Sequence, residues 1–424
     1  MTKHILISGA GIAGPALAWW LHHHGFQATV VERAPSLREG GYKVDIRGVA
    51  VDVVRRMGLL EQVHAASTDM RGAAFVDKRG KQLATLDADT FGFRHGDDTE
   101  ILRGDLARIL YDATRADTEY VFGDWITGLD QHPDGVDVTF AHGAPRRFDL
   151  VVGADGLHSG VRALAFGPEE DHLRRFDAYI SISTVPNSFE LDRWELLHSA
   201  APGRMVNVYS TARAADAKAA FWFTAPQLTY DRRDVDGQKA LVADRFAGLG
   251  WEIPALLEAM RSAGDFYFDP VCQVVMDELS TGRVTLLGDA GYCPSPASGQ
   301  GTSLALAGAY VLAGELASGF PEALPRYEAL MRPFIEKNQA LAKTALRGII
   351  PQSRAFAWFN TRMIKLMPYL PGRNRVLEQM ARPIREAANA LELKEYPAHR
   401  PARPGRSRVP AKTAVRHPDK PHQS

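Results

Sequence analysis

The residues that first suggest chemistry are the glycines of the segment GAGIAG (residues 9–14) and an acid further along the chain, Glu32. In this G-x-G-x-x-G spacing, Gly9 permits a tight turn, Gly11 lets the backbone approach a pyrophosphate, and Gly14 lets a helix pack closely on a strand. A helix that begins here points free N–H groups and its positive dipole end at phosphates. Glu32 can then accept hydrogen bonds from a ribose diol. The pattern predicts dinucleotide binding and leaves NAD, NADP and FAD open; the alternative is a glycine-rich turn within a hydrophobic hairpin.

Two later segments each place a carboxylate at the end of an expected strand. VVGADGLHSGVR (151–162) carries Asp155 and Arg162, and RVTLLGDAGYCPSPASGQGTSLALAGAYVLAGEL (283–316) carries Asp289. Ligands of open α/β sheets bind at the carboxyl ends of the strands. We therefore expect Asp155 and Asp289 to lie beside the ligand that the glycine-rich segment binds.

Three other groups of residues are candidates for chemistry or binding. Asp45 and Arg47, in YKVDIRG, are expected on a strand near the bound ring, with a substrate-orienting or catalytic role; an ordinary ion pair on a strand is the alternative. The aromatic run 221–223 lies on a strand, so Trp222 must face away from Phe221 and Phe223. One side is core and the other lines a substrate pocket, and the sequence does not say which. His22-His23-His24 predicts no metal site, because consecutive residues on a helix point in different directions.

Apolar alternation and helical spacing predict the elements that carry these residues. Strands are expected at residues 4–8, 28–32, 136–140, 148–152, 177–185, 205–211, 219–224, 266–275 and 283–288. Helices are expected at residues 12–24, 49–58, 102–114, 238–247, 253–262 and 302–317, with more helices to about residue 396. The strand, glycine turn, helix and strand at the N-terminus make a βαβ unit.

The expected fold class is α/β: a Rossmann-like domain with a βαβ start and a mixed sheet, an inserted α+β domain, and C-terminal helices. Residues 1–171 and 281–345 are expected to form the discontinuous nucleotide-binding domain, and residues 172–280 the substrate domain. Residues 346–396 are predicted to be helical. Residues 397–424 hold six prolines and seven Lys or Arg against one Asp, which predicts a flexible basic tail.

Composition narrows the class of protein. The 424 residues contain 50 Lys+Arg and 50 Asp+Glu, and this neutral balance argues against a dedicated nucleic-acid binder. Two isolated cysteines exclude a disulfide framework and predict a reducing compartment, the cytoplasm. The uncharged run 5–21 reads better as the strand and helix of the glycine motif than as a signal peptide or a membrane span.

Together the three motifs, in this order and at this spacing, resemble the group A FAD-dependent monooxygenases, the para-hydroxybenzoate hydroxylase-like family that includes the tetracycline-inactivating flavoenzymes. The resemblance covers roughly residues 3–345 and selects FAD among the dinucleotides. It implies that Glu32 holds the adenosine ribose, Asp289 the ribityl chain, and that Pro296 lies beside the reactive face of the flavin. The cofactor-binding residues it implies are Gly9, Gly11, Ile12, Ala13, Gly14, Glu32, Arg33, Arg38, Arg103, Asp155, Arg162, Gly288, Asp289, Pro296, Gly299, Gly301, Thr302 and Ser303.

Three departures from the family pattern are visible. Ser303 stands where the family usually has Asn, Tyr292 stands where it usually has His, and the stretch after the second strand is shortened to Arg38-Glu39-Gly40-Gly41. The departures leave main-chain contacts intact and indicate a subfamily with a different substrate. The sequence also lacks the WxWxIP segment of flavin halogenases.

The resemblance implies that NADPH visits to reduce FAD, that O₂ adds to form a C4a-hydroperoxide, and that one oxygen passes to a substrate in a dry pocket. The expected substrate is a hydrophobic aromatic or polycyclic compound of secondary or antibiotic metabolism, with Pro296, Asp45 and Arg47 as the catalytic candidates. Two alternatives stay open: a reductase or dehydrogenase of the same fold that does not activate oxygen, and a non-catalytic FAD-binding protein that sequesters a metabolite. No nucleic acid, metal or membrane span is expected, and the expected state is a monomer or weak dimer.

Overall fold

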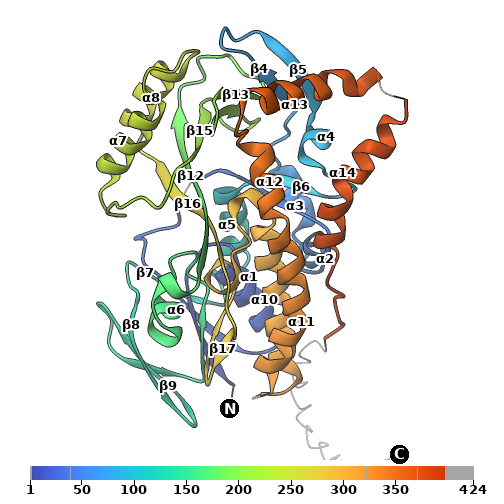
Figure 1. Cartoon of the computed structure of the whole chain (residues 1–424). Coiled ribbons are helices and arrows are strands. Elements are labelled where there is room, and N and C mark those ends of the chain that lie inside the picture. Colours follow the sequence, from blue (N-terminus) through green and yellow to red (C-terminus); the bar gives the residue numbers. More distant parts are fainter. Residues whose placement is uncertain (1, 39, 321, 370, 397–424) are drawn as a thin grey trace, which may run out of the picture.

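Two sheets, one near each end of the molecule, organise the chain in the computed structural model, which describes residues 2–38, 40–320, 322–369 and 371–396 (Figure 1). The lower sheet has the order β17-β18-β11-β1-β2-β7. Its strands are β1 His4–Ser8, β2 Gln27–Glu32, β7 Glu119–Phe122, β11 Leu150–Gly153, β17 Ser280–Thr281 and β18 Val284–Leu286. All pairs in it are parallel except β17 with β18.

The upper sheet has seven strands in the order β16-β12-β15-β14-β13-β4-β5. Its strands are β4 Gly72–Val76, β5 Gln82–Asp87, β12 Leu173–Val185, β13 Trp194–Ala201, β14 Arg204–Ser210, β15 Ala217–Thr224 and β16 Phe266–Val274. The sheet also takes strands from outside the predicted substrate domain 172–280, because β4 pairs in parallel with β13 and extends the sheet from the N-terminal part of the chain. The pairing joins segments far apart in sequence, so local patterning gives no sign of it.

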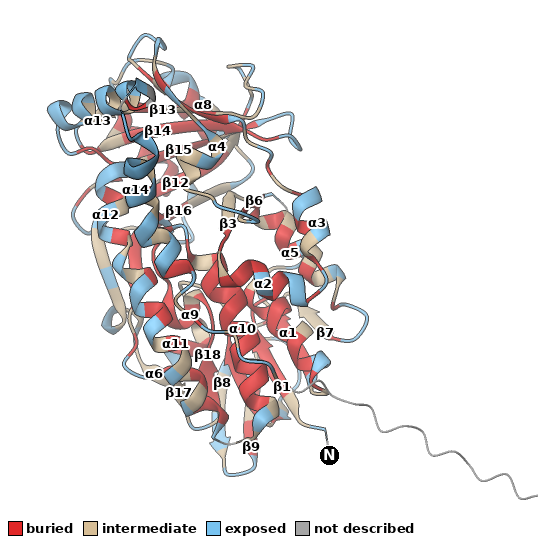
Figure 2. Cartoon of the chain, turned by 90° about the vertical axis from the view of Figure 1, so that its right-hand side faces the viewer, coloured by how far each residue is buried: buried red, intermediate tan, exposed pale blue. Residues whose placement is uncertain are grey.

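Smaller strands complete the structure. β8 Ile126–His132, β9 Gly135–Phe140 and β10 Arg146–Phe148 form an antiparallel sheet at the lower end, and β3 Lys43–Ile46 pairs with β6 Thr99–Leu102. The β3–β6 ribbon lies between the two large sheets (Figure 2).

The helices cover the sheets and connect them. The first group is α1 Ala13–His23, α2 Val49–Arg56, α3 Leu60–Ala65, α4 Ala88–Gly92, α5 Arg103–Asp112, α6 Gly160–Phe166, η1 Glu169–Asp171, α7 Val235–Phe246 and α8 Ile253–Ser262. The second is α9 Asp289–Tyr292, η2 Pro296–Ser298, α10 Gly301–Ser318, α11 Ala323–Ala340, α12 Ala342–Ile349, α13 Arg354–Leu366, η3 Met367–Tyr369 and α14 Arg373–Ala388. The α/β class and the C-terminal helices expected from the sequence are confirmed, whereas the predicted tail 397–424 lies outside the described residues.

The core of the lower body is built around α10. This helix is apolar on all sides and is buried from Thr302 to Leu316, packed among α1, α2 and α11. A helix that is apolar all round needs such an environment. No helix within the described residues is long and apolar enough to cross a membrane.

The C-terminal helices extend from the lower sheet to the upper sheet and part of the way back. In Figure 1, α11 and α12 follow one another up the side of the molecule, α13 lies beside the upper sheet, and α14 returns toward α2. At its end the carbonyl oxygen of Ala388 lies so close to Gly48 that a Cβ there would be 2.5 Å from it. Residues from both sheets and from these helices therefore enclose the same space.

Candidate active site

A cavity of about 2250 Å³ lies between the two sheets. Typical sites for one small ligand are roughly 300–1,000 Å³, so this space has room for a dinucleotide and a second molecule. All three sequence motifs contribute to its wall, through Gly9 and Gly11, through Asp155, and through Asp289. The strand ends that the sequence predicted to converge are thus brought together.

The glycine-rich turn has the geometry that its spacing predicts. Gly9 has a φ of +108°, and Gly14 packs so tightly that a Cβ would lie 1.9 Å from the Gly9 carbonyl oxygen. Helix α1 begins after Ile12 with no side chain capping its N–H groups and no acid in its first turn. Because Ile12 and Ala13 line the cavity, these free N–H groups face a space where an anion can bind.

Glu32 is held at the end of β2 by two main-chain hydrogen bonds. Its carboxylate accepts from the N–H of Ala10 at 2.8 Å and of Ala34 at 2.9 Å, and it lines the cavity. Nearby, the Arg33 guanidinium lies 4.9 Å from the centre of the Trp125 ring, and Arg38 is exposed on the cavity wall. Both cations line the cavity that Glu32 and the glycine-rich turn also line.

Asp155 organises the second motif. Its carboxylate accepts hydrogen bonds from the Ser8 and Ser159 hydroxyls and from the N–H groups of Gly160 and Val161. Burial raises the pKa of Asp155, although these donors act in the opposite direction. The bond from Ser8 fastens the second motif to the end of β1.

Arg162, which was predicted to serve the cofactor, does not line the cavity. Its side chain is fully buried and donates to the carbonyl oxygens of Ala290 at 2.8 Å and Leu157 at 2.7 Å. A buried guanidinium needs such acceptors, and here they belong to the second and third motifs. Arg162 therefore joins these two turns.

The third motif forms a turn between β18 and α10. Gly288 and Gly299 have φ values of +66° and +65°, and Pro296 is exposed on the cavity wall. Asp289 faces the cavity, where burial raises its pKa and Arg103 partly opposes that shift. Arg103 itself lies against the first motif, because a Cβ at Gly11 would be 3.3 Å from its Nη2.

Helix α10 begins at Gly301, and Gly301 and Thr302 line the cavity as expected. Ser303 is fully buried behind them and does not reach the cavity wall; its hydroxyl accepts a hydrogen bond from the N–H of Arg47 at 3.0 Å. Tyr292 is also buried, with its hydroxyl 3.0 Å from that of Tyr327, so this departure from the family pattern has a packing role.

Gln300 is a cavity residue that the sequence analysis missed. Its side chain is fully buried, lines the cavity, and has neither its amide nitrogen nor its amide oxygen bonded within the described residues. A buried amide without a partner is costly, so this group is placed for a ligand that both donates and accepts. The GQG sequence at the start of α10 was the available signal.

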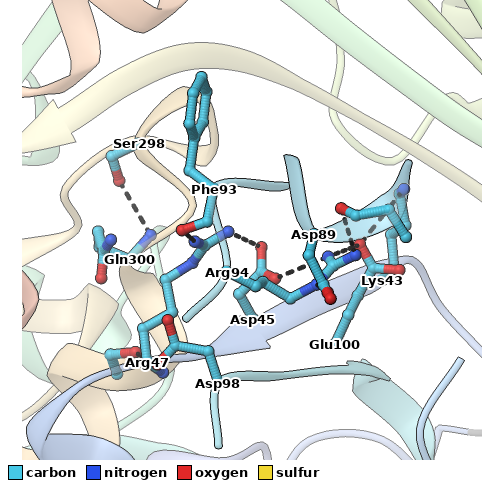
Figure 3. Close-up of polar contacts among 12 residues, drawn as sticks. Lys43, Asp45, Arg47, Asp89, Phe93, Arg94, Asp98, Glu100, Ser298 and Gln300 are labelled. Atoms are coloured by element: carbon cyan, nitrogen blue, oxygen red, sulfur yellow. Dashed lines mark hydrogen bonds and ion pairs between the residues drawn. The ribbon is translucent and has the colours of Figure 1, made fainter. Parts of the chain in front are cut away.

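Asp45 and Arg47 belong to a chain of charged groups between the sheets (Figure 3). Arg47 is paired with Asp45 at 2.9 Å, and Arg94 bridges Asp45 at 3.6 Å and Glu100 at 3.2 Å. Lys43 continues the chain, 3.3 Å from Glu100. The two candidates are therefore held in one orientation beside the cavity.

The far end of this row of charged groups reaches the upper sheet. Lys43 lies 2.5 Å from Glu195, whose other oxygen accepts from Asn207, and Asn207 accepts from the Trp222 indole. Burial alone would raise the pKa of Glu100, but the Lys43 and Arg94 charges outweigh it and lower that pKa. Burial alone would lower the pKa of Lys43, but the Glu100 and Glu195 carboxylates outweigh burial and raise that pKa.

The aromatic strand β15 has its two faces in different environments. Trp222 lines the cavity, whereas Phe221 and Phe223 are fully buried against α7 and α8 in the core of the upper body. The sequence left open which face lines a pocket; here Trp222 is on the cavity face and the two phenylalanines are on the core face, because alternate side chains of a strand point to opposite faces. Tyr42 and Tyr267, with ring centres 5.3 Å apart, add an aromatic wall that the sequence analysis did not identify.

The arrangement defines the class: a Rossmann-like nucleotide-binding domain whose three strand-end motifs border a large cavity closed by a second sheet. Residues 2–340 match the family model described as FAD binding domain. The chain belongs to this FAD-binding family, and it is an FAD-dependent monooxygenase of group A.

Relatives with known names agree. A flavin-dependent monooxygenase from Legionella longbeachae is 42% identical over 344 residues, which cover 80% of this chain and 88% of the relative. The FAD-dependent monooxygenase asL6 of Sarocladium schorii is 32% identical and covers 94% and 99% of the two chains. The crystal structure of tetracycline destructase Tet(55) superposes with a TM-score of 0.80 at 39% identity, covering 93% of this chain and 99% of that one.

Proposed function

We propose that this enzyme uses NADPH and O₂ to transfer one oxygen atom to a hydrophobic polycyclic compound bound between the flavin and the upper sheet. The observation that carries the proposal is that residues of the three nucleotide-binding motifs line the same cavity as Trp222 and Tyr267. Tetracyclines are the first compounds to test, because the structural relative Tet(55) is named a tetracycline destructase.

The residues present fit FAD. The uncapped N-terminus of α1 suits the pyrophosphate, Glu32 suits the ribose diol, and the Asp289 carboxylate on the cavity wall suits the hydroxyls of the ribityl chain. The amide of Gln300, unbonded within the described residues, suits a ring edge that both donates and accepts hydrogen bonds. When bound, the flavin supplies hydride acceptance and oxygen activation, which no side chain provides.

The chain's own residues position and shield the reacting groups. The N-terminus of α10, at Gly301 and Thr302, directs its N–H groups and positive dipole end into the cavity, where they favour negative charge. Asp45 and Arg47 are placed to orient a polar substituent of the substrate. Trp222, Tyr42 and Tyr267 provide apolar surface that excludes water from the reacting atoms.

NADPH is proposed as a transient reductant. The sequence has a single G-x-G-x-x-G segment, so it offers no second dinucleotide fold to hold NADPH through the cycle. Such a reductant binds, transfers hydride and leaves.

The test is NADPH oxidation by the FAD-loaded enzyme under ¹⁸O₂, with and without tetracyclines and other polycyclic phenols. The proposal predicts substrate-dependent NADPH oxidation and a product that carries one ¹⁸O atom. Oxidation of NADPH that leaves every candidate substrate unlabelled, or a product labelled only from water, would contradict it.

A further inference from the structure

Exposed apolar side chains gather on one part of the surface, the C-terminal hairpin formed by α13, η3 and α14. Of the ten large apolar side chains that are more than a third exposed within the described residues, eight lie between residues 356 and 380. They are Phe356, Trp358, Phe359, Met363, Leu366, Tyr369, Val376 and Met380. Figure 2 shows α13 and α14 mostly in the colour of exposed residues. A concentration of exposed large apolar side chains on neighbouring helices is typical of an interaction surface.

The spacing on α13 makes a stripe. Phe356, Phe359, Met363 and Leu366 follow one another at intervals of three or four residues, which places them on one face of the helix. In a globular protein such a stripe normally faces the core. Here no residue of α13 is buried, and Tyr369 beyond its end is 82% exposed. The stripe is therefore only partly covered: α13 lies against β5, yet the four side chains stay 37–54% exposed.

A small molecule in the active-site cavity does not cover this surface. Five of the eight, Trp358, Phe359, Met363, Val376 and Met380, border the cavity, whereas Phe356, Leu366 and Tyr369 are outside its lining. The apolar surface runs from the edge of the cavity onto the outside of the molecule. Its partner must be larger than a substrate.

Charge identifies the kind of partner. Residues 353–388 carry seven Arg or Lys and two Glu, although the chain as a whole has no formal net charge. Arg382 and Arg385 pair with Glu386 and Glu378. Among the described residues the remaining five have no carboxylate within ion-pair distance: Arg354, Arg362, Lys365, Arg373 and Arg375.

A second copy of the chain would bring the same positive charges to the contact and be repelled, whereas an anionic surface is attracted. Basic residues beside exposed Trp, Phe and Tyr on an amphipathic helix are typical of segments that lie in the interface of a membrane. Tyr and Trp are suited to the headgroup level, because each combines an apolar ring with a polar tip.

We propose that the α13–α14 hairpin docks on the surface of a bilayer that contains anionic lipids. The apolar stripe of α13 lies in the interfacial region, the arginines and Lys365 meet the headgroups, and the neighbouring mouth of the cavity faces the lipid. Apolar compounds dissolved in the bilayer then reach the cavity directly. The docking holds whatever the enzyme oxygenates, so it does not rest on the proposed function.

The experiment is co-sedimentation of the FAD-loaded full-length protein with vesicles of phosphatidylcholine, with and without phosphatidylglycerol. We expect binding to the anionic vesicles that weakens with added salt, because screening reduces the headgroup attraction. The double variant Trp358→Ser/Phe359→Ser should bind at least about tenfold more weakly, since two large apolar side chains no longer enter the interface. The control Leu164→Ser/Val235→Ser removes two other exposed apolar side chains, 45% and 44% exposed against 66% and 54% for Trp358 and Phe359, and should bind normally.

A spectroscopic measurement locates the contact. Vesicles of brominated lipids should quench part of the tryptophan fluorescence, and the variant Trp358→Phe should bind but lose that quenching. Unchanged FAD content and thermal unfolding in each variant establish that it is folded. The proposal is overturned if anionic vesicles do not bind the protein. It is also overturned if the double variant binds as well as the wild type, which is the result expected if the basic segment 397–424 were the site of attachment. It is also overturned if the patch instead holds two copies together, seen as a dimer that the double variant dissociates.

Discussion

Replacing Gly14 by Ala tests the link between the glycine motif and cofactor binding. The added Cβ would lie 1.9 Å from the Gly9 carbonyl oxygen and 3.3 Å from Ile7 Cγ2. Ordinary contact begins near 3.4 Å, so α1 must move by about 1.5 Å relative to β1. That movement displaces the N–H groups that face the predicted pyrophosphate, and hydrogen bonds to a charged group are each worth about 1.5–3 kcal/mol. Losing about 3 kcal/mol weakens FAD binding roughly a hundredfold.

The assay is a titration of apoprotein with FAD, followed by flavin fluorescence, together with thermal unfolding without FAD. Overpacking costs about 1–3 kcal/mol of stability, so the apoprotein should still fold. Gly250→Ala is the matched control, because a Cβ there meets nothing within 4 Å and the backbone is not in the left-handed region. Wild-type FAD affinity in Gly14→Ala would refute the reasoning.

Further predictions concern the cavity and the charged chain. Trp222→Ala should raise KM for the substrate with little loss of stability, because its side chain lines the cavity. Phe221→Ala, in the core, should lower the free energy of unfolding by about 3–5 kcal/mol and leave KM almost unchanged. The reverse pattern would show that the two side chains lie on the opposite faces. Glu195→Gln leaves the buried Lys43 with one carboxylate and should destabilise the protein by about 2–4 kcal/mol; an unchanged unfolding midpoint would contradict the pairing. Burial would lower the pKa of His158, but hydrogen bonds with Asp269 and Glu169 raise it above 6.5. The stabilising effect of the protonated His158 is therefore fully present below pH 6.5 and is lost as pH rises through its folded-state pKa. His158→Gln should flatten this fall in stability with pH. An unaltered pH profile would show that another group causes the fall.

Much of the nucleotide-binding half followed from the sequence, because its signals are local. The Gly9–Gly14 turn, the strand before it and Glu32 lie within one βαβ unit, whose geometry is set by short-range sterics. The long apolar run 302–317 predicted a buried helix for the same reason, and α10 confirms it with one residue more at each end.

The features that the sequence did not reveal depend on long-range packing. Nothing near Arg162 indicates that its side chain turns inward to the carbonyl of Ala290. The joining of β4 to β13 and the gathering of Lys43, Glu100 and Glu195 likewise require three distant segments to meet. Alternation along β15 divided Trp222 from its neighbours, but only the position of the sheet could say which face lines the cavity.

The most direct test of the central claim is a crystal structure of this enzyme with FAD. The account predicts the ribose of the adenosine at Glu32, the pyrophosphate at the N-terminus of α1, and the flavin ring between Pro296 and the wall that contains Trp222. A flavin nucleotide bound away from Asp289, or a ring that leaves the Gln300 amide without a partner, would contradict it.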